Sequence, residues 1–526
     1  MAVIPPPFRR RARTAAALAL ALACGACFIY RTLTIESEPA SGPSRSISSR
    51  LKAHLDDGTT VVFPNGIAID HDTVRGQGVA YDLALQSRGF VSAVPLSRVV
   101  AMETFRTGVD PLATFAVSTL ATGGAIALSV GIYCATNPKC FGSCPTAYAD
   151  SAGTPVLEAE GFSYSIAPLF EMPDVDRLRT RAAPDGTMRL EIRNEALETH
   201  YINQIHLLEV RHAPDEYVLP DPAHDPIAVR GLRPPLAAAD RAGRNVLPAL
   251  VEHDGIVYRT DSATLGRADS ADARDWIDLD LPAAPQADST VIVLRLRNSL
   301  LNTVLLYDLM LGDHGVYALD YLGRELGRAA AALELGRWYA REMGLRVAVW
   351  DGTAWTTVGR VPDTGPIAWK DVAFTVPSTA AQPLRVRLSF PADNWRVDQI
   401  AVATSSRRAA ARPVPLARVL DQDGRPDSAA LANLRDVDHR YLETTAGQRF
   451  EAVFAAGPAP ADSARTFFLA WQGFYDEWIR RDWLARGRDS TAFHPGPGAL
   501  ADAIRRWRVA QDSTERVFER TRVPVR

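Results

Sequence analysis

The sequence predicts a mainly β protein with a small SH3-like β module, an apolar segment, jelly-roll-like β-sandwich modules with one packed helix, and a C-terminal helix. Short β-prone runs bounded by Gly, Asn and Asp recur from residue 51 onward, which is typical of strands joined by tight turns. Helical periodicity is confined to two stretches, near residues 320–343 and 497–520. Hydrophobic residues make up 47% of the 526 positions, enough for packed cores in several domains.

Changes in composition divide the chain into successive segments. Each boundary falls where an apolar period, a charge pattern or a Ser/Pro-rich stretch begins or ends. The segments are a signal peptide with a lipobox-like end (1–24), a flexible tether (25–50), a small β module (51–110), an apolar segment that could enter a membrane (111–135), a β-domain (136–310), a helix plus part of a β-sandwich (311–404) and a C-terminal β/α region (415–526).

The first thirty residues have the pattern of an export signal. Arginines between positions 9 and 13 form a positive region, and residues 14–23 form an apolar stretch too short to span a bilayer. The tetrapeptide ALAC, which ends at Cys24, resembles a bacterial lipobox, in which the Cys thiol is diacylglycerol-modified before cleavage. We therefore expect lipidation at Cys24. Cys27 is a weaker rival, and ordinary signal cleavage or an uncleaved anchor is the alternative.

Two further stretches bear on where the body of the chain lies. Residues 35–50 are rich in Ser, Pro and Gly and predict a flexible tether. Residues 111–135 are uncharged and long enough to cross a hydrocarbon core of roughly 30 Å. They also contain Gly123-Gly124 and several Ser and Thr, so a helix or hairpin docked on the body is the alternative. We expect this segment to dock or to dip into one leaflet, which leaves the body outside the cytoplasm.

Residues 51–105 predict the small β module. Their β-prone runs alternate with turns at Asp57-Gly58, Asn65-Gly66 and Gly76-Gln77-Gly78. The run Val94–Glu103 looks like the closing strands of small β modules that are common in exported bacterial proteins. Such a module carries no chemistry of its own.

Three cysteines lie at or just after the end of the apolar segment: Cys134, Cys140 and Cys144. Their C-x5-C-x3-C spacing matches no zinc pattern, and the export signal predicts an oxidising compartment. We therefore treat all three as disulfide candidates.

Four stretches stand out in the second half of the chain: CPTAY at 144–148, LEIRNEALETHYIN at 190–203, RTFFL at 465–469 and GFYDEW at 473–478. Together they resemble a family of uncharacterised bacterial exported proteins or lipoproteins with a Cys-Pro-x-x-Tyr motif. The resemblance spans roughly residues 140–485. It implies export but no activity, since no function is established for that family.

A helical period begins near Asp320. Leu322, Leu326, Ala330 and Leu333 follow at spacings of four, four and three, which predicts one helix that packs this stripe on a sheet and ends at Gly344. The preceding stretch, 303–311, reads either as a further strand or as the entry to this helix.

Residues 345–404 predict a sandwich of jelly-roll type, in which Trp350, Trp355 and Trp395 are interleaved among short strands. An exposed tryptophan such as Trp355 could stack on a sugar, but tryptophans in sandwiches more often lie in the core. Residues 405–415, rich in Arg and Ala, predict a linker.

One short pattern occurs twice. The letters PLA followed by D-x-x-G-R begin at Pro235 and again at Pro415, which predicts two related β modules. Asp421, Asp423 and Asp427 suggest a calcium loop, but the ligand order of an EF-hand is not met, and a solvated Asp-Gly turn is the simpler interpretation.

Residue types that could serve catalysis or bind a metal occur in the sequence, but they do not combine into the pattern of a known site. His200, His206 and His212 recur at every sixth residue, so a metal site is conceivable, but nothing else in the sequence marks one. Glu195 and Glu198 could act as acid and base, yet they more simply shape a turn. The sequence holds no G-x-S-x-G or H-E-x-x-H motif and no phosphate-binding Gly loop. It therefore predicts no catalytic, cofactor-binding or metal residue.

The formal net charge of -3, with mixed signs, gives no electrostatic footprint for nucleic acid. The sequence predicts a membrane-anchored lipoprotein of the cell envelope, periplasmic or at the cell surface, that acts as a non-enzymatic scaffold or binding protein. Its expected partner is membrane lipid, through the N-terminal anchor and residues 111–135, while a protein or glycan partner is left open. The alternative is an envelope carbohydrate-binding protein or hydrolase.

Lipidation at Cys24 can be tested in cells. Metabolic labelling with an alkyne fatty acid should mark the wild-type chain and leave Cys24→Ala unmarked, because the lipid is transferred to that thiol. Cys27→Ala is the matched control and should keep the full label. Equal labelling of wild type and Cys24→Ala would contradict the prediction.

Overall fold

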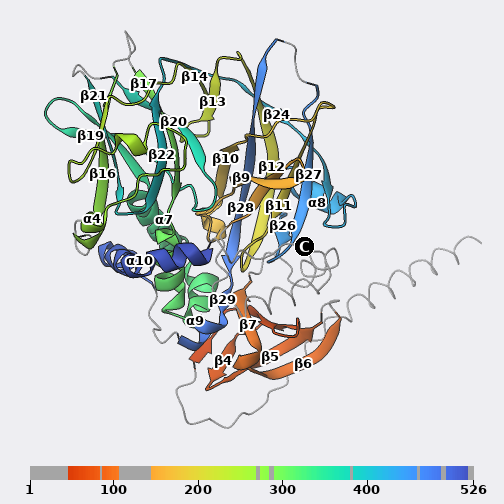
Figure 1. The fold of residues 1–526 in the computed structure, drawn as a ribbon. Helices are drawn as coiled ribbons and strands as arrows, with labels where there is room; N and C mark the ends of the chain where they lie inside the picture. The colour runs from red at the N-terminus through yellow and green to blue at the C-terminus, as the bar shows by residue number, and fades with distance from the viewer. Residues whose placement is uncertain are drawn as a thin grey trace, which may run out of the picture. The chain divides into compact units, whose positions relative to one another are not determined.

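The structure is a computed structural model in which β-strands hold more of the described residues than helices do (Figure 1), so the mainly β prediction is confirmed. It describes residues 45–82, 86–105, 144–267, 273–282, 289–378, 383–458, 462–486 and 493–518. The expected signal peptide with Cys24, the rival Cys27, the apolar segment 111–135, Cys134 and Cys140 lie outside these residues.

The predicted small β module forms a curled sheet (Figure 1, orange), which begins at Arg45, so the predicted tether does not extend to residue 50. Its strands are β1 (Arg45–Ile47), β2 (Leu51–Leu55), β3 (Thr60–Phe63), β4 (Ile67–Asp70), β5 (Thr73–Tyr81), β6 (Ser87–Pro95), β7 (Val99–Thr104) and the distant β29 (Ile479–Arg480). They are ordered β1-β4-β5-β3-β2-β7-β29, with β6 paired to β5, and a 3₁₀ turn (Leu96–Arg98) links β6 to β7. Gly76 and Gly78 let β5 pass close to Phe63, since a Cβ at either glycine would lie within 2.9 Å of that ring.

A first β-sandwich is built from two distant parts of the chain. Its strands are β8 (Thr146–Ser151), β9 (Thr154–Glu160), β10 (Met172–Arg177), β11 (Thr187–Arg193), β12 (Glu198–His212), β24 (Ala411–Val414), β25 (Leu416–Leu420), β26 (Leu442–Thr444), β27 (Arg449–Ala455) and β28 (Ala464–Glu477). The sheet β25-β27-β11-β8-β9 packs on the sheet β10-β28-β12-β24, which β26 extends. Trp471, Phe162 and Leu190 lie in the core between them.

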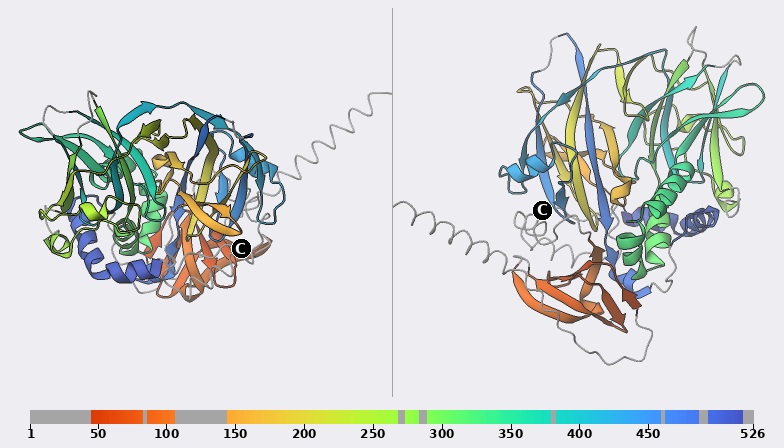
Figure 2. Two further views of the ribbon diagram at one scale, coloured as in Figure 1. Left: turned by 45° about the horizontal axis from the view of Figure 1, so that its top comes forward. Right: turned by 180° about the vertical axis from the view of Figure 1, so that it is seen from behind.

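A second β-sandwich is inserted between those two parts (Figure 2). Its strands are β15 (Ala237–Asp240), β16 (Arg274–Leu281), β17 (Ser289–Asn298), β18 (Leu345–Trp350), β19 (Trp355–Val361), β20 (Lys370–Pro377), β21 (Leu384–Pro391) and β22 (Trp395–Val402). The sheets are β15-β16-β21-β18-β19 and β20-β17-β22. The predicted boundary at residue 310 therefore does not separate two cores, because β16 pairs with β21 and β17 with β22 across it.

The linker predicted at residues 405–415 is wrong. Its residues form β23 (Ser405–Arg408) and β24, which pair with β14 (Pro226–Arg230) and β12 respectively. A small sheet, β13 (Tyr217–Pro220)-β14-β23, thus lies alongside both sandwiches. Strands β23 and β24 are polar because their arginines point away from the core and pair with carboxylates. Arg407, for example, lies 2.6 Å from Glu216.

The helical region is longer than the single helix predicted over residues 320–343. Its first segments are α5 (Leu301–Thr303), a π-helical stretch (Val304–Gly312), α6 (Tyr317–Asp320), a second π-helical stretch (Tyr321–Glu325) and α7 (Ala329–Glu342). They share a core with α9 (Arg481–Arg486), α10 (Pro497–Phe518) and the small β module. The stretch 303–311 is therefore helical. Among the described residues, no helix is both long and apolar enough to cross a membrane.

Four short helices complete the described elements. They are the 3₁₀ turns Pro168–Phe170 and Leu247–Ala249 and the α-helices α4 (Ser262–Arg267) and α8 (Ser428–Asn433). Asp427 caps α8, because its side chain accepts the backbone N–H groups of Ala429 and Ala430.

Gly161→Ala should destabilise the first sandwich. A Cβ at Gly161 would lie 2.4 Å from the indole of Trp471, which is 1% exposed and has no room to move. Overpacking of this kind costs about 1–3 kcal/mol in the free energy of unfolding, measurable by urea denaturation. Gly498→Ala is the matched control, since nothing lies within 4 Å of its Cβ position. Equal stability of the two variants would contradict the packing described.

Candidate functional site

A buried ion cluster joins the two sandwiches. Lys370, at the start of β20 in the second sandwich, reaches to β10 in the first, where its Nζ lies 2.7 Å from Asp174 and 3.0 Å from Asp176. The three side chains are 10%, 8% and 4% exposed. Asp176 also accepts a hydrogen bond of 3.2 Å from the indole N–H of Trp471, which anchors the cluster to the core.

The cluster fixes the charge of its members. Burial opposes the positive charge of Lys370, but the two aspartates outweigh burial and raise the pKa of this lysine, so it stays an ammonium. Burial raises the pKa of Asp176 to about 7, since Lys370 offsets only part of the lost hydration and Asp174 repels a second negative charge.

Glu160 forms a second tie across the same joint. Its Oε2 accepts the backbone N–H groups of Ile367 at 2.6 Å and Ala368 at 2.8 Å, while Oε1 has no hydrogen-bond partner among the described residues. Burial raises the pKa of Glu160 to about 8, because two N–H donors do not replace the water that a carboxylate loses. Gly365 passes so close that a Cβ there would lie 2.5 Å from this carboxyl group.

An apolar groove of about 680 Å³ opens beside the joint, within the size range of small-molecule sites. Helix α7 and the segment before β10 supply its apolar wall, and the side chains include Ile166, Leu169, Phe170, Met172, Leu306 and Leu333. Leu169, Met172 and Leu333 are 53%, 54% and 54% exposed, more than large apolar side chains usually are.

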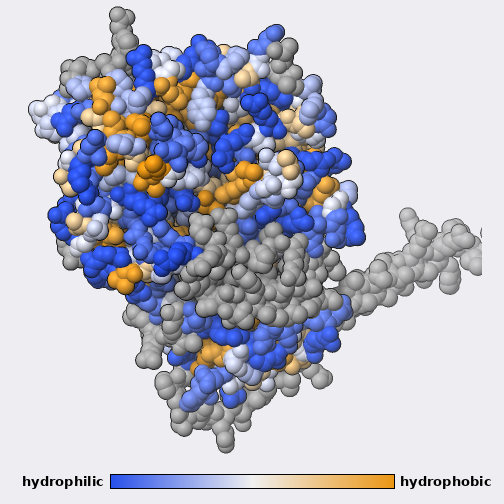
Figure 3. All heavy atoms as spheres, in the orientation of Figure 1, coloured by the Kyte–Doolittle hydropathy of each residue, from blue (hydrophilic) through white to orange (hydrophobic). Residues whose placement is uncertain are grey.

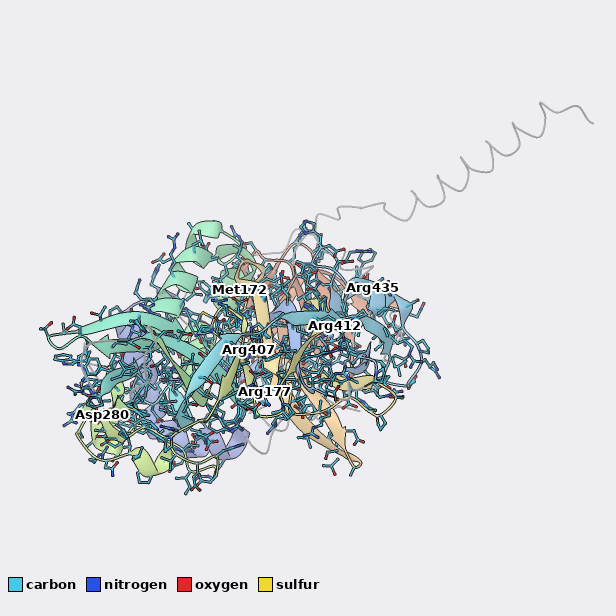
Figure 4. The ribbon with its side chains drawn as sticks, turned by 90° about the horizontal axis from the view of Figure 1, so that it is seen from above. Met172, Arg177, Asp280, Arg407, Arg412 and Arg435 are labelled. Carbon is cyan, nitrogen blue, oxygen red and sulfur yellow. The ribbon has the colours of Figure 1, made fainter. Side chains whose placement is uncertain are left out.

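The groove continues into a smaller polar cleft of about 40 Å³ at the ion cluster. Tyr164, His224 and Asp363 line both spaces. Figure 4 labels Met172 and Arg177, the two ends of β10, which border the groove and the cleft respectively. On the face in Figure 3, hydrophobic side chains are scattered among hydrophilic ones over the coloured residues.

The position of Leu333 corrects the predicted helix stripe. Leu322 and Leu326 are buried as expected, at 3% and 0% exposed, but Leu333 faces the groove. The helical phase changes because the chain leaves the helix after Glu325 and starts again at Ala329.

His224 has a backbone conformation that glycine normally adopts. Its φ is +71°, and the five residues from Asp221 form a turn in which the Asp221 side chain accepts the N–H groups of Ala223 and Asp225. Burial lowers the pKa of His224, so its imidazole is neutral at pH 7. A strained, half-buried histidine on the wall of a pocket marks this turn as part of the candidate site.

The same turn occurs at the two copies of the repeated pattern. Asp240 and Asp421 each accept the N–H groups two and four residues later, and Gly243 and Gly424 take φ values of +77° and +76°. The pattern therefore predicts a local turn correctly. The calcium loop is not formed, because Asp421 serves the turn, Asp423 pairs with Arg425 at 2.8 Å and Asp427 caps α8.

A second polar cluster lies where the first sandwich meets the helical region. Glu198, fully buried, accepts hydrogen bonds from the Tyr307 hydroxyl at 2.8 Å and the Cys144 backbone N–H at 3.2 Å. Glu477 adjoins it and pairs with Arg480 at 3.0 Å. Burial raises the pKa of Glu198 to about 7 and that of Glu477 well above its usual range, so the two carboxyl groups hold at least one proton at neutral pH.

The three histidines that made a metal site conceivable are not brought together. A β-bulge between Ile202 and Gln204 reverses the alternation of β12, so that His200 and His206 face opposite sides of the sheet. His206 and His212 are six residues apart on one extended strand, roughly 20 Å. Among the described residues, no group of three or more His, Cys, Asp and Glu is arranged to hold a metal ion.

The other sequence candidates have separate roles. Glu195 accepts hydrogen bonds from Thr146 at 2.8 Å and Tyr148 at 2.6 Å, whereas Glu198 belongs to the cluster with Tyr307. Within the described part of the chain there is no disulfide, and Cys144 is buried at 1% exposed. A disulfide within the cluster stays a prediction, since Cys134 and Cys140 lie outside the described residues.

The three tryptophans of the second sandwich differ. Trp395 lies in the core, 0% exposed, as the core interpretation predicts. Trp350 and Trp355 instead form a half-buried pair on the outer face, with ring centroids 5.4 Å apart. The guanidinium of Arg387 lies 4.4 Å from the Trp355 ring centroid and Arg385 lies 5.6 Å from it, so arginines cover the face that a sugar would need.

No protein-family model, curated protein or solved structure matches this chain. Sequence reasoning missed Lys370, Asp174 and His224. A lysine at the entrance of a buried strand was the one available signal, because lysine is seldom buried without a partner.

Stability should fall as pH rises from about 5 to 8.5. Glu160 binds its proton more tightly in the folded chain, so its contribution is fully present below its unfolded pKa of 4.5 and is lost as pH rises through about 8. The Gln side chain of Glu160→Gln cannot ionise. At pH 8.5 the free energy of unfolding of this variant, measured by urea denaturation, should therefore be higher than that of wild type by on the order of 2 kcal/mol. Exposed Glu334→Gln is the matched control. Identical pH slopes for Glu160→Gln and wild type would contradict this account.

Proposed function

We propose that this chain is a membrane-anchored lipoprotein of the cell envelope that binds an apolar ligand in the groove beside α7 and does not catalyse a reaction on it. The lipobox-like end at Cys24 and the Ser/Pro tether support anchoring. The groove supports binding. It is the single observation that carries the proposal.

The groove has the properties of a small-molecule site. Such sites are concave and mostly apolar, with a few polar groups that orient the ligand. The apolar wall includes three half-exposed side chains, Leu169, Met172 and Leu333, and covering them with a ligand would remove apolar surface from water. Tyr164, His224 and Asp363 supply polar groups at the end that meets the cleft.

The groups in the cleft favour binding over catalysis. Lys370 is held as an ammonium by two carboxylates, and a charged lysine is neither a nucleophile nor a base. Asp363 is occupied by the Asn302 side chain at 2.9 Å and by the Tyr339 hydroxyl. Both groups thus have structural roles.

A glycan partner is the second candidate, because Trp350 and Trp355 form a partly exposed aromatic pair. Sugar stacking would have to displace Arg387, which is bound to Asp278 at 2.6 and 2.8 Å. The groove is therefore favoured over the tryptophan pair as the ligand-binding site.

Leu333→Asp should weaken binding in the groove. The full chain carrying Cys24→Ala, in detergent-free buffer, should bind the neutral fluorescent probe N-phenyl-1-naphthylamine, and Leu333→Asp should raise its Kd about tenfold, since a charge replaces apolar contact. Leu236→Asp, at a 61% exposed leucine outside the groove lining, is the matched control and should leave Kd unchanged. No probe binding, or equal Kd values for both variants, would overturn the proposed function.

A further inference from the structure

The groove carries two positive charges that the described residues do not neutralise. Arg337 on α7 is exposed, lines the groove and makes no hydrogen bond or ion pair with a described residue. Arg360 on β19 also lines it, and its one hydrogen bond among the described residues, to the carbonyl of Ala340, is long at 3.3 Å. Nearby Arg341, by contrast, pairs with Glu342 at 2.8 Å.

Asp363, which supplies the one carboxyl group on the groove wall among the described residues, does not offset these charges. Asp363 accepts hydrogen bonds from the side chains of Tyr339 and Asn302. Burial raises the pKa of Asp363, so it ionises less readily than a surface aspartate. Because burial lowers the pKa of His224, that imidazole adds no charge at neutral pH.

We propose that the ligand of the groove is a long-chain carboxylate, with its hydrocarbon tail along the apolar wall of α7 and its head group at Arg337 and Arg360. This inference rests on the proposed function and names the class of ligand that it takes. A guanidinium donates two parallel hydrogen bonds to a carboxylate, a geometry that lysine cannot match.

The apolar wall suits an unbranched tail. Leu333, Gly336 and Ala340 recur at spacings of three and four on α7, so they form one continuous strip along the helix. Gly336 leaves room there for Phe170, whose ring would lie 2.7 Å from a Cβ at that position. Each methylene that the strip removes from water should strengthen binding about fourfold.

Competition against the neutral probe distinguishes the head group from the tail. On the full chain carrying Cys24→Ala, palmitate should displace N-phenyl-1-naphthylamine at about a tenfold lower concentration than hexadecanol, which has the same chain length and no charge. Hexadecyltrimethylammonium should be the weakest of the three, because both arginines repel it.

Substitutions of the two arginines test whether they cause the higher affinity for palmitate than for hexadecanol. The double variant Arg337→Gln, Arg360→Gln should lose about tenfold in palmitate affinity and keep its hexadecanol affinity within about twofold. The double variant Arg418→Gln, Arg435→Gln removes two exposed charges that do not line the groove and is the matched control (Figure 4 labels Arg435). It should bind palmitate as wild type does.

The outcomes separate this inference from the proposed function. Equal potency of palmitate and hexadecanol, or unchanged palmitate affinity in the Arg337→Gln, Arg360→Gln variant, would overturn the carboxylate ligand and leave an apolar-ligand site standing. Failure of wild type to bind the neutral probe would overturn both. Probe binding by each variant also shows that it is folded.

Discussion

The joint between the sandwiches depends on the buried contact of Lys370 with Asp174 and Asp176. Each sandwich has its own apolar core, and the ion cluster links them directly, beside the apolar contacts that the small sheet β13-β14-β23 makes with both. Removing one partner of a buried ion pair typically costs about 3–5 kcal/mol, because the other charge is left without compensation. Glu160 adds a second tie from the same sandwich. Since Lys370 lines the cleft that continues into the groove, this joint also sets the walls of the binding site.

The buried carboxylates fall into two kinds with opposite effects on stability. Burial alone would raise the pKa of Glu103, but Lys52 and His54 outweigh it, and the pKa lies near 2. Its contribution is present above pH 4.5 and is lost as pH falls toward 2. Glu160 and Glu198, with raised pKa values, lose theirs as pH rises through 7 to 8. The contributions of these three carboxyl groups are therefore present together only at mildly acidic pH.

Local sequence patterns predicted individual strands and turns. The way these elements assemble depends on pairing between strands that are far apart in the sequence. Alternating β-prone runs gave the strands of the small β module, and the repeated D-x-x-G-R pattern gave a turn with one geometry at Asp240 and Asp421. The insertion of one sandwich into the other was hidden, because strands pair across long stretches of chain. The site was hidden for the same reason: Lys370 and Asp174 are 196 residues apart, and only the folded chain brings them together.

His224 occupies a turn position that glycine normally takes, and this exception marks the candidate site. Three turns with the same hydrogen bonds place Gly243, Gly424 and His224 in the left-handed region. Glycine adopts that conformation freely, whereas a side chain there costs on the order of 1 kcal/mol or more. The two glycines do not line the groove or the cleft, but the histidine lines both. The strained residue thus lies where the apolar groove meets the charged cleft.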